Sequence, residues 1–314
     1  MKFLSLSIVS IALLLGPVLG EFRDILEICN ETPYTGAFRR YLLDNPDVLA
    51  IYQERRNSTI YVPSDKAMRK CFPEEHAISR RGTASRTVQA QYMIEQQANA
   101  IKAAQSQSRS VRKTADNQTS PDGGDSVVVT VNNGSPPIKR HWRVAQHFTG
   151  IQIQSGAGSV VNIMFGDIQC LQGLIHVIDG CFNVPEPVTS TLQSIGTTKF
   201  LDALNTAKLG ASSDAEGQIT IFAPNDAAFV NQPSLDASGI NHHTVVGVAL
   251  YSTLLLDGTK FKTLAGDYLY VNIVNGQVFI NCVAILASDL LASGGVVHTV
   301  GKIIPYLSAP PVTC

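Results

Sequence analysis

Apolar residues three and four positions apart dominate the segments that open each half of the chain. This spacing occurs in "FRDILEIC" (22–29), "AFRRYLLDN" (37–45) and "LQSIGTTKFLDALNTA" (192–207), and it predicts amphipathic helices. Further on, "YLYVNIVNGQVFINCVAI" (268–285) alternates apolar and polar residues on both sides of Asn275-Gly276, which predicts a β-hairpin. Leading helices followed by a mainly antiparallel sheet indicate an α+β fold.

Two motifs occur twice in the chain, in the same order. The first is "STIYVPSDKAM" (58–68), which returns as "ITIFAPNDAAF" (219–229). The second is "DIQCLQGLIHVID" (167–179), which returns as "DLLASGGVVHTVG" (289–301) with its aspartate, glycine and histidine at a constant offset. A repeated pair of motifs in a fixed order indicates a duplicated domain.

The linker between the copies lies in "NVPEPVTS" (183–190), because prolines interrupt both kinds of periodicity there. The predicted organisation is a signal peptide, domain 1, a linker, domain 2 and a C-terminal tail, over residues 1–20, 21–184, 185–190, 187–307 and 308–314.

The first copy is longer than the second between its two motifs. The segment 96–125 is rich in Gln, Ser, Ala and Asp and has almost no large apolar residue. Such a segment buries too little surface to offset its ordering entropy. We therefore expect a polar, mobile insertion in domain 1 at about 96–125, with a functional lid as the alternative.

The repeated proline and aspartate mark the passage from a strand to a helix. Pro63 and Pro224 remove a backbone donor and end the strand. Asp65 and Asp226 then stand where a side-chain oxygen caps a helix start. A capping role is far more common for such an aspartate than catalysis, and we predict that both are structural.

His176 and His298 lie in apolar, β-branched strands. We predict that each is buried and neutral and that its hydrogen bonds fix a neighbouring loop. A metal or catalytic role would need partner ligands, and no Cys, His or carboxylate cluster lies nearby in the sequence. The pair His242-His243 is a weak metal candidate that we expect instead to lie in an exposed loop.

Together these motifs resemble a tandem fasciclin-type (FAS1) protein over nearly all of residues 21–307. The first family motif is TVFAPTDxAF-like, the second is NGVIHVIDxVL-like, and a Thr-Leu-x-Gly element lies between them. The matching stretches are "TIYVPSDKAM" (59–68), "QGLIHVIDGCF" (172–182), "TIFAPNDAAF" (220–229), "TLAG" (263–266) and "GGVVHTVGKII" (294–304).

The resemblance implies that each domain is a wedge-shaped β-sandwich of mainly antiparallel strands with a helical layer. It also implies extracellular adhesion or matrix interaction. The family often has a Tyr-His pair between its two motifs that is linked with adhesion. The matching places here contain Tyr92 and Tyr251 without the histidine, and these tyrosines are our adhesion candidates.

The N-terminus resembles a secretory signal. Lys2 precedes the apolar run 4–15, and the small residues Val18 and Gly20 suit a signal-peptidase site. Cleavage after residue 20 is our prediction, with an uncleaved anchor as the alternative. No later segment reaches membrane-spanning length. We expect a secreted protein that is extracellular or associated with a cell wall or matrix.

Secretion gives meaning to the glycosylation sequons and the cysteines. Asn57 and Asn117 begin clean acceptor sequons. An even number of cysteines in an oxidising compartment suggests up to three disulfides, with the pairing left open. The pair Cys170–Cys181 is disfavoured, because the strand-like residues between these positions hold them apart. The candidates are Cys29, Cys71, Cys170, Cys181, Cys282 and Cys314.

Composition and charge narrow the class of protein. The hydrophobic share of 45% is typical of a globular chain, and the net charge of −1 gives no reason to expect nucleic acid as a partner. No GxSxG, HExxH or P-loop motif occurs in the sequence. We predict a non-enzymatic interaction protein without cofactor or metal, whose partner is an extracellular protein, a glycan or a cell-surface or matrix component. The alternative is an extracellular carrier of a small apolar ligand.

Overall fold

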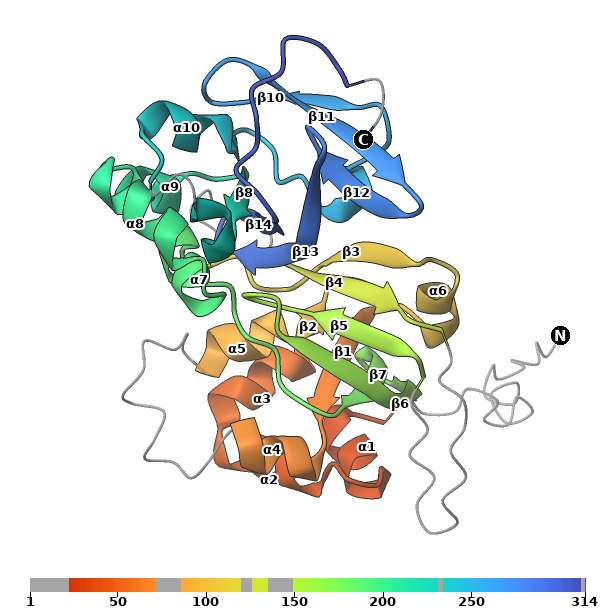
Figure 1. Cartoon of the computed structure of the whole chain (residues 1–314). Helices are drawn as coiled ribbons and strands as arrows, with labels where there is room; N and C mark the ends of the chain where they lie inside the picture. Colours follow the sequence, from red (N-terminus) through yellow and green to blue (C-terminus); the bar gives the residue numbers. More distant parts are fainter. Residues whose placement is uncertain (1–22, 72–85, 120–125, 135–148, 231–233, 312–313) are drawn as a thin grey trace, which may run out of the picture.

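The structure, a computed structural model, describes residues 23–71, 86–119, 126–134, 149–230, 234–311 and 314. The predicted signal peptide lies outside the described residues. Residues 25–178 and 188–300 fold into two units with the same order of elements (Figure 1). We call these units domain 1 and domain 2; the domain limits given above stay predictions.

Domain 1 begins with helices and ends with strands. Its elements are α1 (Ile25–Glu31), α2 (Gly36–Asp44), α3 (Pro46–Gln53), β1 (Ser58–Pro63), α4 (Asp65–Cys71), α5 (Arg86–Tyr92), β2 (Ile94–Glu95), α6 (Ile101–Gln105), β3 (Arg109–Lys113), β4 (Val127–Asn132), β5 (Ile151–Gln154), β6 (Val160–Cys170) and β7 (Gly173–Ile178).

Domain 2 repeats this order. Its elements are α7 (Val188–Ser194), α8 (Thr198–Thr206), α9 (Gly210–Ala215), β8 (Ile219–Pro224), the 3₁₀ helix η2 (Asp226–Phe229), α10 (Ala237–His242), β9 (Thr244–Val245), the 3₁₀ helix η3 (Ser252–Leu254), β10 (Lys260–Lys262), β11 (Tyr268–Val274), β12 (Gln277–Ile280), β13 (Val283–Ala292) and β14 (Gly295–Val300).

Each domain contains a seven-stranded sheet, and the two sheets have the same topology. The orders are β2-β1-β7-β6-β5-β4-β3 and β9-β8-β14-β13-β12-β11-β10. Only β1–β7 and β8–β14 pair in parallel among these named strands; the other pairs are antiparallel. The predicted α+β class and mainly antiparallel sheet are confirmed.

The parallel pair in each sheet joins the two repeated motifs. Ser58 pairs with Gly173, and Ile219 pairs with Gly295. A Cβ at either glycine would lie 2.1 Å from the carbonyl oxygen of its partner residue. Only glycine allows the strands this close, which explains why both copies of the second motif contain it.

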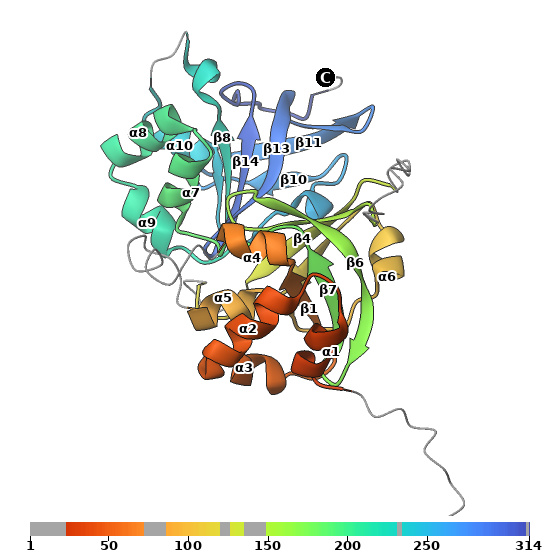
Figure 2. The same cartoon turned by 90° about the horizontal axis from the view of Figure 1, so that it is seen from below.

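Two apolar clusters fill each domain. One lies between the helical layer and the sheet, around Phe38 and Leu42 in domain 1 and around Phe200 and Leu204 in domain 2. In the other, side chains of β1 and β7, or of β8 and β14, meet those of the strands at the far end of the same sheet. Each sheet therefore folds over on itself as a sandwich; α1–α5 lie on one side of the domain 1 sheet, and α6 lies on the other (Figure 2).

The prediction of a mobile polar insertion is wrong for residues 96–119. This segment contains α6 and β3, and Ile101, Ala104 and Val111 pack into buried clusters. The few apolar side chains of this segment are enough to order it, because neighbouring strands supply most of the apolar surface that they contact. By strand register, the segment 96–110 is only one residue longer than its counterpart 246–259; most of the extra length of domain 1 lies in 64–93, 114–126 and 133–150.

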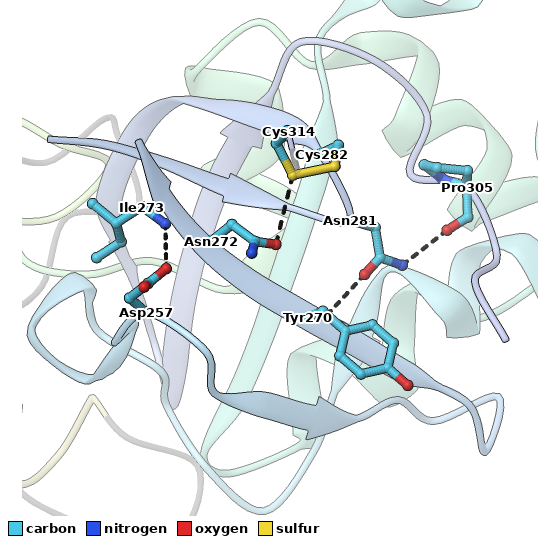
Figure 3. Close-up of a disulfide and its surroundings, with 8 residues drawn as sticks. All are labelled: Asp257, Tyr270, Asn272, Ile273, Asn281, Cys282, Pro305 and Cys314. Atoms are coloured by element: carbon cyan, nitrogen blue, oxygen red, sulfur yellow. Dashed lines mark hydrogen bonds between the residues drawn. A yellow bond between two sulfur atoms is a disulfide. The ribbon is translucent and has the colours of Figure 1, made fainter. Parts of the chain in front are cut away.

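Two disulfides form. Cys71 is bonded to Cys181, and Cys282 is bonded to Cys314 (Figure 3). A third disulfide, which the even cysteine count allowed, is absent among the described residues, because Cys29 and Cys170 are free thiols buried in the core of domain 1. Burial raises the pKa of the Cys29 thiol to about 12, so this thiol stays protonated.

The domains share a buried apolar cluster, with β3 and β4 of domain 1 lying against β13 of domain 2 (Figure 1). We call this cluster the interdomain core. Its buried members are Val129, Leu291 and Val296, and Val111, Val127, Val131, Ala249 and Tyr251 pack around them.

Polar bonds surround the interdomain core. Arg109 on β3 forms an ion pair with Asp289 on β13, whose side chain is completely buried. The side-chain amide of Gln154 donates to the carbonyl groups of Ser288 and Asp289, at 2.8 and 2.9 Å. A buried apolar cluster with an ion pair beside it fixes the orientation of the two domains.

We predict that Arg109→Ala destabilises the protein by about 3 kcal/mol, because it leaves a buried carboxylate without its cation. Urea denaturation measures this loss. Asp289→Asn in the Arg109→Ala background removes the unpaired charge, so the double variant is expected to lose much less than the sum of the single variants. Strictly additive losses would contradict the pairing.

Candidate functional site

The aspartates of the first motif cap helices that lie far from them in the sequence. Oδ1 of Asp65 accepts a 2.6 Å hydrogen bond from the backbone N–H of Ala37, in the first turn of α2. Oδ1 of Asp226 accepts a 2.9 Å bond from the N–H of Lys199 in the first turn of α8. Its Oδ2 accepts a further 2.7 Å bond from the hydroxyl of Thr198.

The expected cap at the aspartates' own helix is made by the preceding residue instead. Ser64 Oγ accepts from Ala67 N–H at 3.4 Å, and Asn225 Oδ1 accepts from Ala228 N–H at 3.1 Å. The N-cap residues of α2 and α8 make no side-chain cap bond of their own. Asp65 and Asp226 therefore satisfy helix donors that would otherwise lack a partner, and they tie the helical layer to the sheet.

His176 and His298 are buried, and their bonding is the same in both domains. Nδ1 of each histidine accepts the backbone N–H of the aspartate that begins the second motif, Asp167 or Asp289, at 3.2 and 3.4 Å. Nε2 of each donates at 2.8 Å to a backbone carbonyl in the loop after the edge strand, that of Asn99 or Leu250. These bonds require the neutral ring with its proton on Nε2.

In each domain the side chains of the two motifs also accept two backbone N–H groups of the same loop, one at each motif. The aspartate Oδ1 accepts the N–H of Ile101 or Ser252, at 2.8 and 2.7 Å. The threonine of the first motif, Thr59 or Thr220, accepts the N–H of Asn99 or Leu250, at 2.7 and 2.8 Å. The motif residues thus hold this loop in place in both domains. That they serve structure alone stays our prediction.

Neither adhesion candidate from the sequence forms an exposed surface. Tyr92 is fully buried, and its hydroxyl donates to the carbonyl of Val127 at 2.8 Å. Tyr251 is half-buried and packs on the interdomain core. Both rings are apolar bodies that the fold buries, so the expectation that they contact an adhesion partner is not supported.

The strand register also corrects the alignment of the Tyr-His position. Tyr61 N–H donates to the carbonyl of Met93 at 3.1 Å, as Phe222 N–H donates to that of His243 at 2.9 Å. The residues equivalent to Tyr92-Met93 are therefore His242-His243, and not those around Tyr251. The sequence could have shown this equivalence, because the β-branched run "TVV" (244–246), which contains β9, directly follows His242-His243.

His242 and His243 are buried, which contradicts their expected place in an exposed loop. His243 donates from Nδ1 to the carbonyl of Gly239 at 2.8 Å and accepts the N–H of Ile304 at 2.9 Å. It is therefore neutral, and burial lowers its pKa to about 4. This ring holds the segment that follows β14 in place.

His242 has a different environment. Its Nδ1 lies 2.6 Å from Oδ2 of Asp267 and its Nε2 lies 3.3 Å from the carbonyl oxygen of Pro305. The carbonyl of Pro305 can only accept a hydrogen bond. Tyr306 stacks on the ring with centroids 3.9 Å apart. The segment Ile304–Tyr306 is thus bound by two adjacent histidines.

One polar network distinguishes domain 1 from domain 2. The buried carboxylate of Glu95 accepts hydrogen bonds from Tyr61 and from the amide of Asn99, whose oxygen accepts from Arg112 at 3.0 Å. Burial raises the pKa of Glu95. The equivalent residues of domain 2 are apolar: Phe222, Val245, Leu250 and Phe261.

Two cavities lined by described residues open to solvent. One, of about 520 Å³, lies between the domains and is lined by the linker and by Gln89, Thr119 and Ser293. The other, of about 590 Å³, lies among α7, α8 and α9. Hydroxyl and amide groups line much of both. Within the described part of the chain, no group of three or more His, Cys, Asp or Glu side chains is placed to hold a metal ion.

Comparison with known proteins now identifies the fold. Residues 196–305 match the fasciclin domain. This part of the chain is a fasciclin domain. Domain 1 has the same strand order, both motifs and the same hydrogen bonds, so the predicted resemblance to a tandem fasciclin-type protein is confirmed.

Several relatives carry fasciclin names. The chain is 31% identical over 170 residues to the fasciclin-like arabinogalactan protein CTB11 of Cercospora beticola, covering 51% of this chain and 46% of that protein. It is 31% identical over 158 residues to a fasciclin-like arabinogalactan protein of Arthroderma benhamiae, covering 48% and 37%. The chain spans about half or less of the length of these curated relatives.

Among solved structures, a FAS1 domain pair from the insect cell adhesion molecule fasciclin I aligns with 86% of this chain and 97% of its own. Its sequence identity is 14% and its TM-score 0.40. In the described residues of the present chain, no helix has the length and apolar character needed to cross a membrane.

For the fasciclin motif aspartates, we predict that Asp226→Ala lowers the stability of domain 2 by about 0.5–2 kcal/mol through loss of the α8 cap. Asp226→Asn keeps an acceptor and is expected to lose less. Hydrogen exchange read by mass spectrometry localises the effect to peptides of α8. A folded Asp226→Ala variant with normal exchange in α8 but no partner binding would show a functional aspartate instead.

Acid is predicted to destabilise domain 2 more than domain 1. Burial lowers the folded pKa of His243 and His298 in domain 2 and of His176 in domain 1. Since the unfolded histidine pKa is about 6.5, the unfolded state binds protons that the folded state does not, and stability falls as the pH falls below 6.5. In domain 1 the raised pKa of Glu95 has the opposite effect.

Denaturation followed by domain-resolved hydrogen exchange between pH 7.5 and pH 4.5 measures this difference. His243→Gln keeps one donor and one acceptor without a titrating ring, and its domain 2 is expected to lose less stability on acidification than the parent. If the parent and His243→Gln lose equal stability on acidification, His243 does not cause the acid sensitivity of domain 2.

Proposed function

We propose that this tandem fasciclin-domain protein is a secreted, non-catalytic interaction protein of the extracellular space, associated with a cell wall, matrix or cell surface. The observation that carries the proposal is the interdomain core with its Arg109–Asp289 pair. It joins the domains into one rigid body and leaves their outer faces in a fixed relation, which suits a protein that presents surfaces to a partner.

The use of the motif residues supports a non-catalytic role. The aspartates, threonines and histidines of both motifs bond to backbone groups of their own domain. The names of the relatives support an adhesion-type role, since they include fasciclin-like arabinogalactan proteins and human periostin, which is 26% identical over 156 residues.

A carrier of a small ligand is the second candidate, and the cavity of about 520 Å³ between the domains is where such a ligand would bind. Apolar side chains such as Phe182, Val184 and Pro187 form much of its lining, with Gln89 and Ser293 among the polar groups, and this mixture is compatible with the small apolar ligand expected from the sequence.

The test of the interaction role is co-sedimentation of the native, disulfide-bonded protein with isolated wall and matrix material. We expect saturable binding that is lost when the protein is reduced and unfolded. The carrier is favoured instead if native protein binds no such material and a small molecule co-purifies with it in stoichiometric amount.

Secretion makes a separate prediction for the purified protein. The mature chain is expected to begin near Glu21 and to carry glycan at Asn57 or Asn117, both of which are exposed. Two thiols, Cys29 and Cys170, are expected to react after denaturation only. Intact mass spectrometry decides, with Asn57→Gln and Asn117→Gln as controls. A chain that keeps Met1 and has six reactive thiols would rule secretion out.

A further inference from the structure

The outer face of the β10–β11 hairpin in domain 2 corresponds to the face that domain 1 uses for the interdomain core. Both are antiparallel pairs: Val111 lies opposite Val129 in β3–β4, and Lys260 lies opposite Tyr270 in β10–β11. The register is fixed by equivalent bonds, from the N–H of Ala115 to Ile94 in domain 1 and from that of Leu264 to Thr244 in domain 2.

The side chains on these two faces differ in chemistry. Domain 1 has Val111, Lys113, Val127 and Val129, and domain 2 covers most of them. At the equivalent positions domain 2 has Lys260, Lys262, Tyr268 and Tyr270. We call these four residues the Tyr-Lys face. It lies on the end of domain 2 that points away from domain 1 (Figure 1).

The Tyr-Lys face is accessible and positively charged. Lys260, Lys262 and Tyr268 are exposed, and Tyr270 is half-buried. Neither lysine forms an ion pair with another described residue. Nζ of Lys260 lies 4.6 Å from the centre of the Tyr268 ring, so a cation and an aromatic ring form one contact point.

The backbone beneath the face is rigid. Asn281 accepts the N–H of Tyr270 at 2.8 Å and donates to the carbonyl of Pro305 at 2.9 Å (Figure 3). The Cys282–Cys314 disulfide ties the next strand junction to the C-terminus of the chain. A face fixed in this way loses little conformational entropy when a ligand binds.

We propose that the Tyr-Lys face binds an acidic polysaccharide, one whose sugar rings carry carboxylate groups. Tyrosine rings stack on the C–H faces of sugars, and lysine ammonium groups pair with carboxylates. An exposed ion pair contributes little alone, and a face of four side chains is smaller than a stable protein interface requires. A polymer with repeated charges fits best, because many weak contacts add through multivalency.

This inference rests on the proposed function and names one partner class and one surface for it. The test measures binding of the full mature protein to immobilised polygalacturonate. The fully methyl-esterified polymer is the matched ligand control, since it has the same sugar rings without their charge. We expect binding to polygalacturonate only, and we expect it to weaken as salt is added.

The variant is Lys260→Gln with Lys262→Gln, and the control is Lys199→Gln with Lys302→Gln, two exposed lysines of the same domain with the same change in net charge. We expect about a fivefold weakening for the first pair and no change for the second. Tyr268→Ala is expected to weaken binding as well. Thermal melting confirms that each variant is folded.

Several results would overturn the inference. Equal effects of the two lysine pairs would show non-specific attraction, and equal binding of the esterified polymer would remove the role of charge. Normal binding by a Lys260→Gln, Lys262→Gln variant that aggregates would show that these lysines only protect the edge strand β10. If the parent protein binds wall or matrix material but not polygalacturonate, this inference fails and the proposed function stands; if it binds neither, both fail.

Discussion

The buried carboxylate of Asp289 is the point on which both domains depend. It lies at the second motif of domain 2, where it holds the loop at Ser252 by a 2.7 Å bond, and it also pairs with Arg109 of domain 1. A charge without solvent exposure requires donors on several sides, and here they come from both domains. The equivalent Asp167 is exposed and holds only its own loop. In domain 2 the motif aspartate therefore stabilises both its own loop and the contact with domain 1.

The two domains share the hydrogen bonds from motif side chains to the backbone, but the core residues around these bonds differ in polarity. His176 and His298 make the same bonds at the same places, because a loop carbonyl and the N–H of the motif aspartate need the same partner in any copy. The residues around Glu95 can differ between the domains, since a set of fully hydrogen-bonded polar groups and a set of apolar groups can fill the same volume. Domain 1 therefore contains a buried carboxylate at a place where domain 2 has valine.

The sequence predicted the fold class, the duplication and the fasciclin motifs, because these depend on local periodicity and on spacing along the chain. It did not predict contacts between residues that are far apart in the sequence. Asp65 was expected to cap its own helix, but it caps α2, which no spacing rule connects to it. The polar segment that contains β3 has few apolar residues of its own, and its Val111 packs in a cluster to which both β4 and domain 2 contribute. Tyr251 was aligned with Tyr92 by residue type, whereas the strand register selects His242.

The interdomain contact joins two different faces, the β3–β4 face of one domain and the β13 face of the other. A contact of this kind leaves one face of each type free at the ends of the pair, so copies could add without limit. The chain opposes this at both ends. Val111 and Val129 give way to Lys260 and Tyr270 on the outer face of domain 2, and Leu291 gives way to Gln169 on that of domain 1. A charged and polar end cannot form the apolar cluster that holds the pair together, so the same substitutions that stop further stacking leave domain 2 with a cationic, aromatic surface free for another kind of partner.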